Sequence, residues 1–196
     1  MVTAEQRAIA ATARAAEAPR AVDPAMARDE GLARAQAWAA LATIPDPEIP
    51  AISIVELGIV RDVRVEDGVL AVDITPTYSG CPATDVILHS ITAALAEAGY
   101  PGARVVSKLS PPWTTDWIAP EGRRRLAAYG IAPPGAAAAR IDVSGISPRR
   151  RPAVPVPCPR CASTRTRLLA QFGSTACKAL YRCDACLEPF DYFKPH

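Results

Sequence analysis

The spacing of apolar residues in the first two thirds of the chain predicts regular secondary structure. Leu32, Trp38 and Leu41 recur at helical spacing and predict a helix over residues 30–42. This helix has to end before residues 44–50, where three prolines favour an extended, turn-rich segment.

Strands are predicted where apolar and polar residues alternate with a period of two. The alternation covers residues 59–65 and 69–75, and Asp67-Gly68 between them is a typical hairpin turn. Residues 103–109 show a similar pattern and predict a third strand. These runs indicate a small sheet.

Two further helices complete this part of the chain. One is predicted to begin just after Gly80, with Pro82 in its first turn, and to end at Gly99. Another is predicted over residues 121–129. The apolar face of the first consists of Val86, Ile87, Ile91, Ala94 and Leu95. The order strand, strand, helix, strand, helix predicts a compact α/β domain over residues 30–132.

Composition changes on both sides of that domain. Residues 1–29 are rich in Ala and Arg and predict a flexible extension. Residues 133–157 are rich in Pro and Arg and predict a semi-rigid linker. Residues 158–196 hold five of the six cysteines and predict a separate metal-binding module.

Two Cys-x-x-Cys pairs form the core of this module. Cys158 with Cys161 and Cys183 with Cys186 supply four thiolates, the tetrahedral set that Zn²⁺ prefers in structural sites. A module this short needs a metal or a cross-link to fold. Four thiolates also hold iron–sulfur clusters, and two disulfides or free thiols are the non-metal alternatives.

The other two cysteines are isolated. Cys177 is favoured as a small buried side chain, with reactivity promoted by Lys178 as the alternative. Cys81 lies at a strand-to-helix transition, where a helix N-terminus stabilises a thiolate. A nucleophilic role needs a nearby base, and His89 lies two turns further along the same predicted helix. A transient metal or cluster ligand is therefore the preferred interpretation of Cys81.

Composition and charge exclude several classes of protein. The 196 residues are 49% hydrophobic and 21% charged, which excludes a disordered chain, and no apolar run is long enough to cross a membrane. The first residues lack the apolar core of a signal peptide, so a cytoplasmic location is expected. Residues 41–132 carry a net charge of −4 (7 basic, 11 acidic), and residues 133–196 carry +6 (10 basic, 4 acidic). A solvated or protein-docking face is favoured over nucleic-acid binding.

Three segments of the α/β part resemble the SufT-like iron–sulfur assembly domains. They are residues 46–48, residues 54–60 and the loop of residues 75–82. The resemblance implies that Cys81 is the essential cysteine and that Asp46 and Glu48 form the acidic turn of the site, with Thr77 in the same loop as Cys81. From the residues alone, the two carboxylates are expected to cap a turn, with acid–base chemistry as the alternative.

The cysteine module adds a second resemblance. Residues 158–161, 172–180 and 188–194 are similar to the PaaD family, accessory subunits encoded with the phenylacetyl-CoA oxygenase (1,2-epoxidase) of bacterial phenylacetate breakdown. This implies a non-catalytic factor that assembles or delivers an iron–sulfur cluster, with the oxygenase subunits, above all the reductase, and the cluster assembly machinery as partners. The alternative is a stable docking subunit with structural zinc and no cluster transfer. The sequence leaves open whether the protein forms a homodimer.

Overall fold

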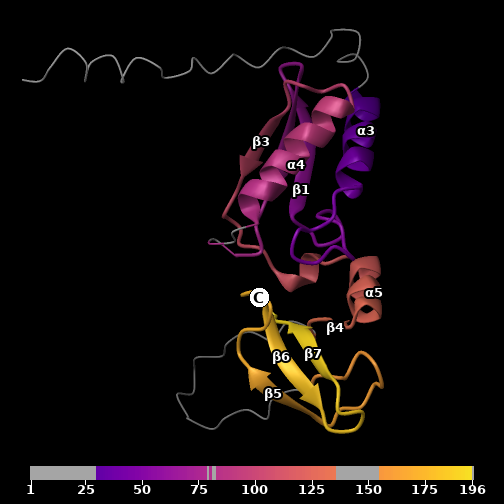
Figure 1. Cartoon of the computed structure of the whole chain (residues 1–196). Coiled ribbons are helices and arrows are strands. Elements are labelled where there is room, and N and C mark those ends of the chain that lie inside the picture. The colour runs from indigo at the N-terminus through magenta and orange to yellow at the C-terminus, as the bar shows by residue number, and fades with distance from the viewer. Residues whose placement is uncertain (1–29, 79, 81–82, 136–154, 196) are drawn as a thin grey trace, which may run out of the picture.

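The computed structural model describes residues 30–78, 80, 83–135 and 155–195, and places them in two units, each built on its own sheet (Figure 1). The first unit has a three-stranded sheet in the order β1-β2-β3, and the second has a four-stranded sheet in the order β4-β7-β6-β5. The chain is therefore an α/β domain followed by a small, all-β module, which confirms the predicted fold class.

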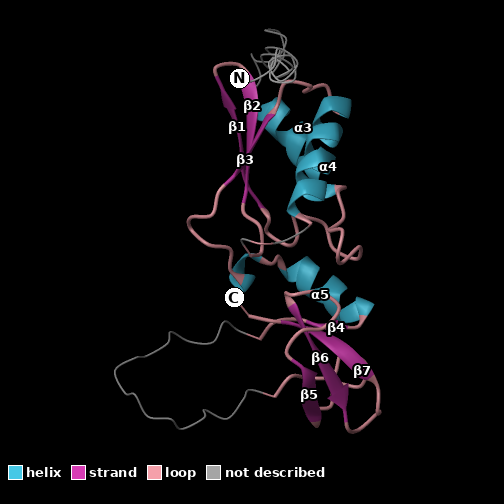
Figure 2. Cartoon of the chain, turned by 60° about the vertical axis from the view of Figure 1, so that its left-hand side comes forward, coloured by secondary structure: helices cyan, strands magenta, loops and turns pink. Residues whose placement is uncertain are grey.

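The α/β domain packs two helices on one face of its sheet (Figure 2). β1 is antiparallel to β2, and β2 is parallel to β3, so α4 forms the crossover between β2 and β3. The elements are α3 (Glu30–Ala42), β1 (Val60–Glu66), β2 (Val69–Ile74), α4 (Thr84–Glu97) and β3 (Arg104–Ser107). The short helix η2 (Thr115–Trp117) and α5 (Pro120–Tyr129) follow.

The second unit is a ribbon of antiparallel strands joined by one short parallel strand. Its elements are β4 (Ile131–Ala132), β5 (Thr166–Ala170), β6 (Lys178–Cys183) and β7 (Pro189–Phe193). β6 pairs with both β5 and β7, and β4 runs parallel to β7. Because β4 directly follows α5, the last two residues of the predicted α/β domain lie in the sheet of the ribbon.

The predicted elements are present, with corrections in detail. α3 has the predicted bounds, but its buried face is Ala33, Ala37 and Leu41, while Leu32 is 53% exposed. These buried residues follow one another at intervals of four positions, and two of the three are small alanines. The prediction that Leu32 belongs to the apolar face is therefore wrong. Val86 is likewise exposed, and α4 buries Ile87, Ile91 and Leu95 instead.

The start of α4 also differs from the prediction. Among the described residues the helix begins at Thr84 rather than just after Gly80, and Pro82 lies outside the described part. Gly99 follows the helix with a φ of 97°, as expected of a residue that ends it.

One hydrophobic core continues across the boundary between the two units. The core of the α/β domain includes three residues of the ribbon sheet and its loops, Ile131, Cys177 and Phe193. Phe193 is fully buried, and its ring lies 5.9 Å from the ring of Trp113. In Figure 1 the end of β7 accordingly points at the α/β domain. In the part of the chain that is described, no helix has the length and apolar character to span a membrane.

Candidate metal centre and inter-domain cavity

The two cysteine pairs of the ribbon converge at its far end. Cys158 and Cys161 lie in the turn before β5, while Cys183 is the last residue of β6 and Cys186 lies in the turn between β6 and β7. The four sulfur atoms all lie within 4.8 Å of one another. The Sγ atoms of Cys158 and Cys186 are 3.8 Å apart, and those of Cys161 and Cys183 are 3.5 Å apart.

This geometry fits one tetrahedral ion. Four thiolates at about 2.3 Å from a zinc ion are about 3.8 Å from one another. In a multi-iron cluster the four thiolates are divided among two or four irons, which holds sulfurs on different irons further apart. The four residues would thus hold a metal ion that links the two cysteine pairs. Zinc stabilises such small modules in this way.

Backbone groups prepare one of these sulfurs for metal binding. The backbone N–H groups of Cys186 and Ala185 donate to Cys183, the latter at 3.3 Å, and lower the pKa of the Cys183 thiol to about 6. A thiol with this pKa is already largely ionised at neutral pH, which is the form that binds metals.

The acidic turn of the α/β domain is built around Asp46. Its Oδ1 atom accepts hydrogen bonds from the backbone N–H of Glu48 at 2.9 Å and of Ile49 at 2.8 Å. A bridge between Pro45 and Ser53 closes the loop. The expected turn-forming role of Asp46 is therefore present. Asp46 is also only 6% exposed, and its burial raises the pKa of its carboxyl.

A small cavity brings the acidic turn together with the loop after β2. Asp46, Glu48 and Thr77 all line it, although Thr77 lies 31 and 29 residues beyond the two acids in the sequence. The rest of the described wall consists of Ile49, Leu57, Ile59, Pro76, Thr84, Ile87, Cys177 and Phe193. The cavity measures about 10 Å³ for a water-sized sphere, which is about the room of one water or one ion.

The ribbon supplies one wall of this cavity. Cys177 is 3% exposed, and its sulfur lies 3.7 Å from Oε2 of Glu48 and 3.0 Å from Oγ1 of Thr175. Burial, followed by the negative charge of Glu48, raises the pKa of the Cys177 thiol to about 11. Lys178 acts in the opposite direction but is outweighed. The suggestion that Lys178 makes this thiol reactive is therefore wrong, whereas the favoured buried position is confirmed.

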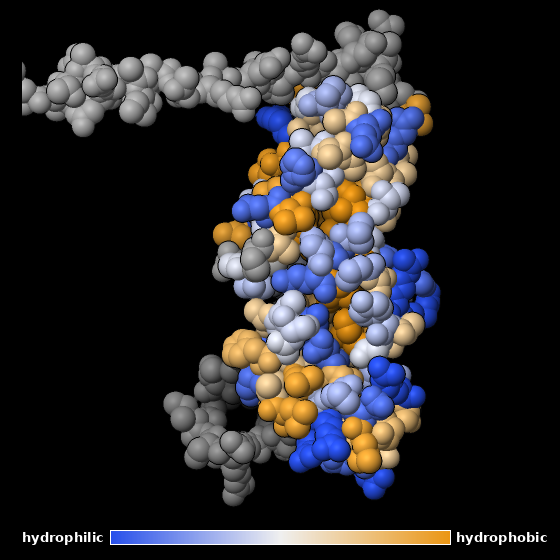
Figure 3. Space-filling model, in the orientation of Figure 1, coloured by the Kyte–Doolittle hydropathy of each residue, from blue (hydrophilic) through white to orange (hydrophobic). Residues whose placement is uncertain are grey.

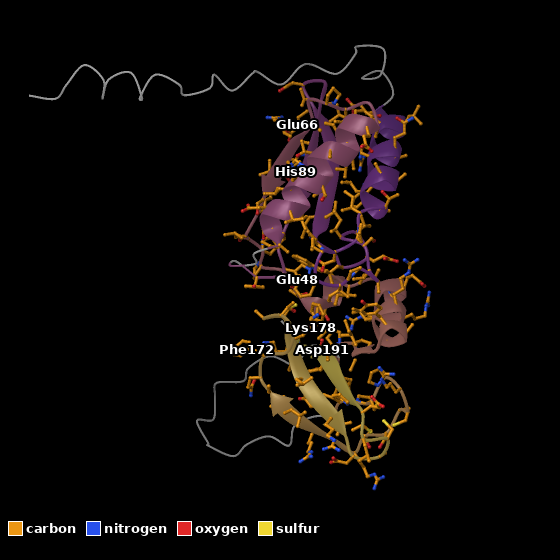
Figure 4. All side chains as sticks on the ribbon, viewed as in Figure 1. Glu48, Glu66, His89, Phe172, Lys178 and Asp191 are labelled. Atoms are coloured by element: carbon orange, nitrogen blue, oxygen red, sulfur yellow. The ribbon has the colours of Figure 1, made fainter. Side chains whose placement is uncertain are left out.

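Buried charges surround Cys177. Lys178 is 4% exposed, and its Nζ lies 3.8 Å from Oδ2 of Asp191. Figure 4 shows Lys178 and Asp191 at the top of the ribbon, next to Glu48 of the α/β domain. The sequence pattern does not identify Lys178 or Phe193 as part of this site, because each approaches the α/β domain only through the docking of the ribbon, and Asp191 enters only as the partner of Lys178.

Two residues considered in the sequence are not placed at this cavity. Cys81 lies outside the described residues, between Thr77 and Thr84 of the cavity wall in the sequence. His89 is exposed on α4 and lies well away from Glu48 in Figure 4.

Comparisons with known proteins agree with both units. Residues 34–107 match the family model of an iron–sulfur cluster assembly protein, and residues 145–194 match the model of the PaaD zinc beta ribbon domain. Neither match extends over residues 1–33.

Curated relatives show the same division. The chain is 50% identical over 157 residues to a subunit of the "Putative 1,2-phenylacetyl-CoA epoxidase" of Escherichia coli, covering 80% of this chain and 90% of that protein. It is 43% identical over 75 residues to the Fe-S protein maturation auxiliary factor SufT of Staphylococcus aureus, covering 37% of this chain and 84% of that one. Among solved structures, a DUF59 domain of Bacillus anthracis aligns over 51% of this chain and 96% of that chain, with 24% identity and a TM-score of 0.47.

Proposed function

The chain belongs to the PaaD family, and we propose that it assembles or delivers an iron–sulfur cluster for a phenylacetyl-CoA epoxidase, with the reductase subunit as client. The relatives of its α/β domain are named maturation auxiliary factors of Fe-S proteins. The protein acts as an accessory factor in the cytoplasm, and the epoxidation itself belongs to another subunit.

One observation carries this proposal. The three described residues that the resemblance assigns to the site, Asp46, Glu48 and Thr77, line a single cavity although they come from separate segments. Cys81 follows Thr77 by four residues in the sequence, and we assign it the role of transient ligand. A thiolate next to carboxylates offers iron both a soft and a hard ligand.

The ribbon has a different role in this proposal. Its four cysteines Cys158, Cys161, Cys183 and Cys186 hold one structural zinc ion, because their sulfur spacing is that of ligands around a single ion. The module also serves as a docking platform, since it exposes several large apolar side chains. These are Leu168, Leu169, Phe172 and Leu187, and Figure 3 shows orange groups among blue ones on this part of the surface.

The test is the iron and sulfide content of the reductase made in cells that carry variants of this chain. Cys81→Ser and Asp46→Asn are expected to leave the reductase deficient in cluster, while the variant proteins retain their zinc. Glu97→Gln, which removes an exposed carboxylate on α4, is the control and is expected to change nothing. Full cluster occupancy in the reductase of the Cys81→Ser strain would contradict the proposal.

A second function is favoured by the name of the Escherichia coli relative, which calls it a subunit. A stable subunit with a structural zinc and no transfer role would co-purify with the oxygenase at fixed stoichiometry. It would also do so after Cys81→Ser. If the Cys81→Ser variant still forms the complex but the client lacks its cluster, the transfer role is supported over this alternative.

A further inference from the structure

The contact between Cys177 and the acidic turn is more than packing. We propose that Cys177 and Glu48 are two ligands of a single divalent transition-metal ion, held in the cavity between the α/β domain and the ribbon. This deepens the proposed function and rests on it for the role of the ion, which would be iron on its way to a cluster.

The Cys177 thiol donates a hydrogen bond to Glu48, and the spacing of the two side chains also suits a shared ion. The sulfur of Cys177 and Oε2 of Glu48 are 3.7 Å apart. Two such ligands on one tetrahedral ion, at about 2.3 Å for sulfur and 2.0 Å for oxygen, are about 3.5 Å apart. The contact already has the separation that a shared metal ion needs.

A buried carboxylate faces the same cavity with an oxygen to spare. Asp46 is 94% buried, and both of its hydrogen bonds reach Oδ1. No described residue donates to Oδ2. A polar oxygen in this position requires water or a cation, and the cavity has room for one of either.

The charges around the cavity are not balanced. The two carboxylates of Asp46 and Glu48 line the cavity, while the nearby ammonium group of Lys178 is already paired with Asp191 at 3.8 Å. A divalent cation would compensate the excess negative charge. On binding, the thiol of Cys177 gives up its proton to solvent, and the sulfur donates to the metal in its place.

The size and the ligand set define the cargo. A cavity of about 10 Å³ admits one ion and excludes an assembled iron–sulfur cluster. One thiolate with carboxylate oxygen suits ions of borderline softness, such as Fe²⁺ or Co²⁺. Two protein ligands leave the remaining positions open, which favours exchange over permanent storage.

Anaerobic titration with Co²⁺ of the full-length protein, with its ribbon cysteines loaded with zinc, tests this site. The wild type is expected to bind one further Co²⁺ with a sulfur-to-cobalt absorption band. Cys177→Ser is expected to remove the part of that band contributed by Cys177 and to weaken binding at least tenfold, and Cys177→Ala serves as a second variant. Glu48→Gln is expected to weaken binding about tenfold while the band persists. Zinc content confirms that each variant is folded, and Glu97→Gln is the control.

The Cys81→Ser variant separates this proposal from the function proposed above. If Cys177 is a ligand, a sulfur-to-cobalt band remains after Cys81→Ser. A band that disappears in Cys81→Ser but is unchanged in Cys177→Ser overturns the proposal. A zinc-loaded protein that binds no Co²⁺ also overturns it. The two proposals can also fail separately. If the cobalt band depends on Cys177 but the client in Cys81→Ser cells contains its full cluster, the ion site is supported and the transfer function is rejected.

Discussion

The ribbon cluster and the inter-domain cavity both contain cysteine, yet the pKa values of Cys183 in the cluster and Cys177 at the cavity are shifted in opposite directions. Cys183 in the cluster receives backbone N–H groups that lower its pKa to about 6, while burial next to Glu48 raises the pKa of Cys177 to about 11. The cluster offers four sulfurs around one point, and the cavity offers one sulfur, carboxylates and open positions. The first is built to keep a metal ion, and the second is suited to exchanging one.

The largest effect is expected from breaking the cluster. Cys183→Ser should remove the zinc and unfold the ribbon, because the metal-binding free energy of such modules, about 10–16 kcal/mol, is also their folding free energy. Zinc analysis and hydrogen exchange over residues 155–195 measure both. Cys177→Ala is the matched control and should retain one zinc. Equal loss of zinc in the two variants would contradict the division between the sites.

A second experiment tests whether the ribbon closes the cavity by packing. Phe193 is fully buried in the core of the α/β domain, so Phe193→Ala should lower the free energy of unfolding by about 3–5 kcal/mol. Phe172 is 68% exposed, and Phe172→Ala should change the free energy of unfolding by only about 0.5 kcal/mol. Urea denaturation compares the two variants. Similar values would mean that the two units are not docked as described.

The two sites also differ in how far the sequence predicts them. The four cysteines of the cluster are evident from local spacing, because the two members of each pair are close in the sequence. The residues at the cavity come from distant positions, such as Glu48 and Cys177 with a separation of 129 residues, and their meeting depends on how the two units dock. Asp46, Glu48 and Thr77 are identified through family resemblance. Cys177 stands out as a cysteine, but nothing in its neighbourhood in the sequence indicates the acidic turn.

Element positions follow the same rule. α3 is predicted with its observed bounds because its signal, a helical stretch stopped by prolines, is local. Its buried face is predicted in part: Leu41 is buried and Trp38 packs against the core, but Leu32 is exposed. Ala33 and Ala37 are missed because their small side chains pack closely and carry little apolar signal of their own. β4 has only two residues and forms through pairing with β7, so no pattern in the sequence could reveal it.

The wall of the cavity differs from the cysteine cluster because its shape depends on backbone packing at Gly58. Gly58 lies between Leu57 and Ile59 of the cavity wall, with a φ of 77°, and a Cβ atom there would lie 2.6 Å from the carbonyl oxygen of Trp117. Gly58→Ala should therefore cost about 2–4 kcal/mol from backbone strain and overpacking. Gly68 has a similar φ of 75° but nothing within 4 Å, so Gly68→Ala should cost about 1–2 kcal/mol.

Thermal unfolding of the zinc-loaded protein distinguishes the two glycine variants. A Gly58→Ala protein as stable as Gly68→Ala would show that the wall of the cavity yields easily. Both variants should retain zinc, since neither residue lies near the cluster.

The smallest effect is expected from pH, and it tests the thiol of Cys177 directly. Its folded pKa of about 11 exceeds the ordinary value of 9.0, so the folded state holds the proton more tightly than the unfolded state. The stabilisation is complete below pH 9 and is lost as the pH rises towards 11, by about 1.4 kcal/mol at pH 10. Lysines and tyrosines titrate in the same range, so the slope is read as the difference between the wild type and Cys177→Ala. If the difference between the two proteins is constant from pH 8 to 10, the thiol is not held neutral by burial. In that case the pKa of the Cys177 thiol would equal its ordinary value, and the thiol would not be a ligand that burial keeps in neutral form for a metal.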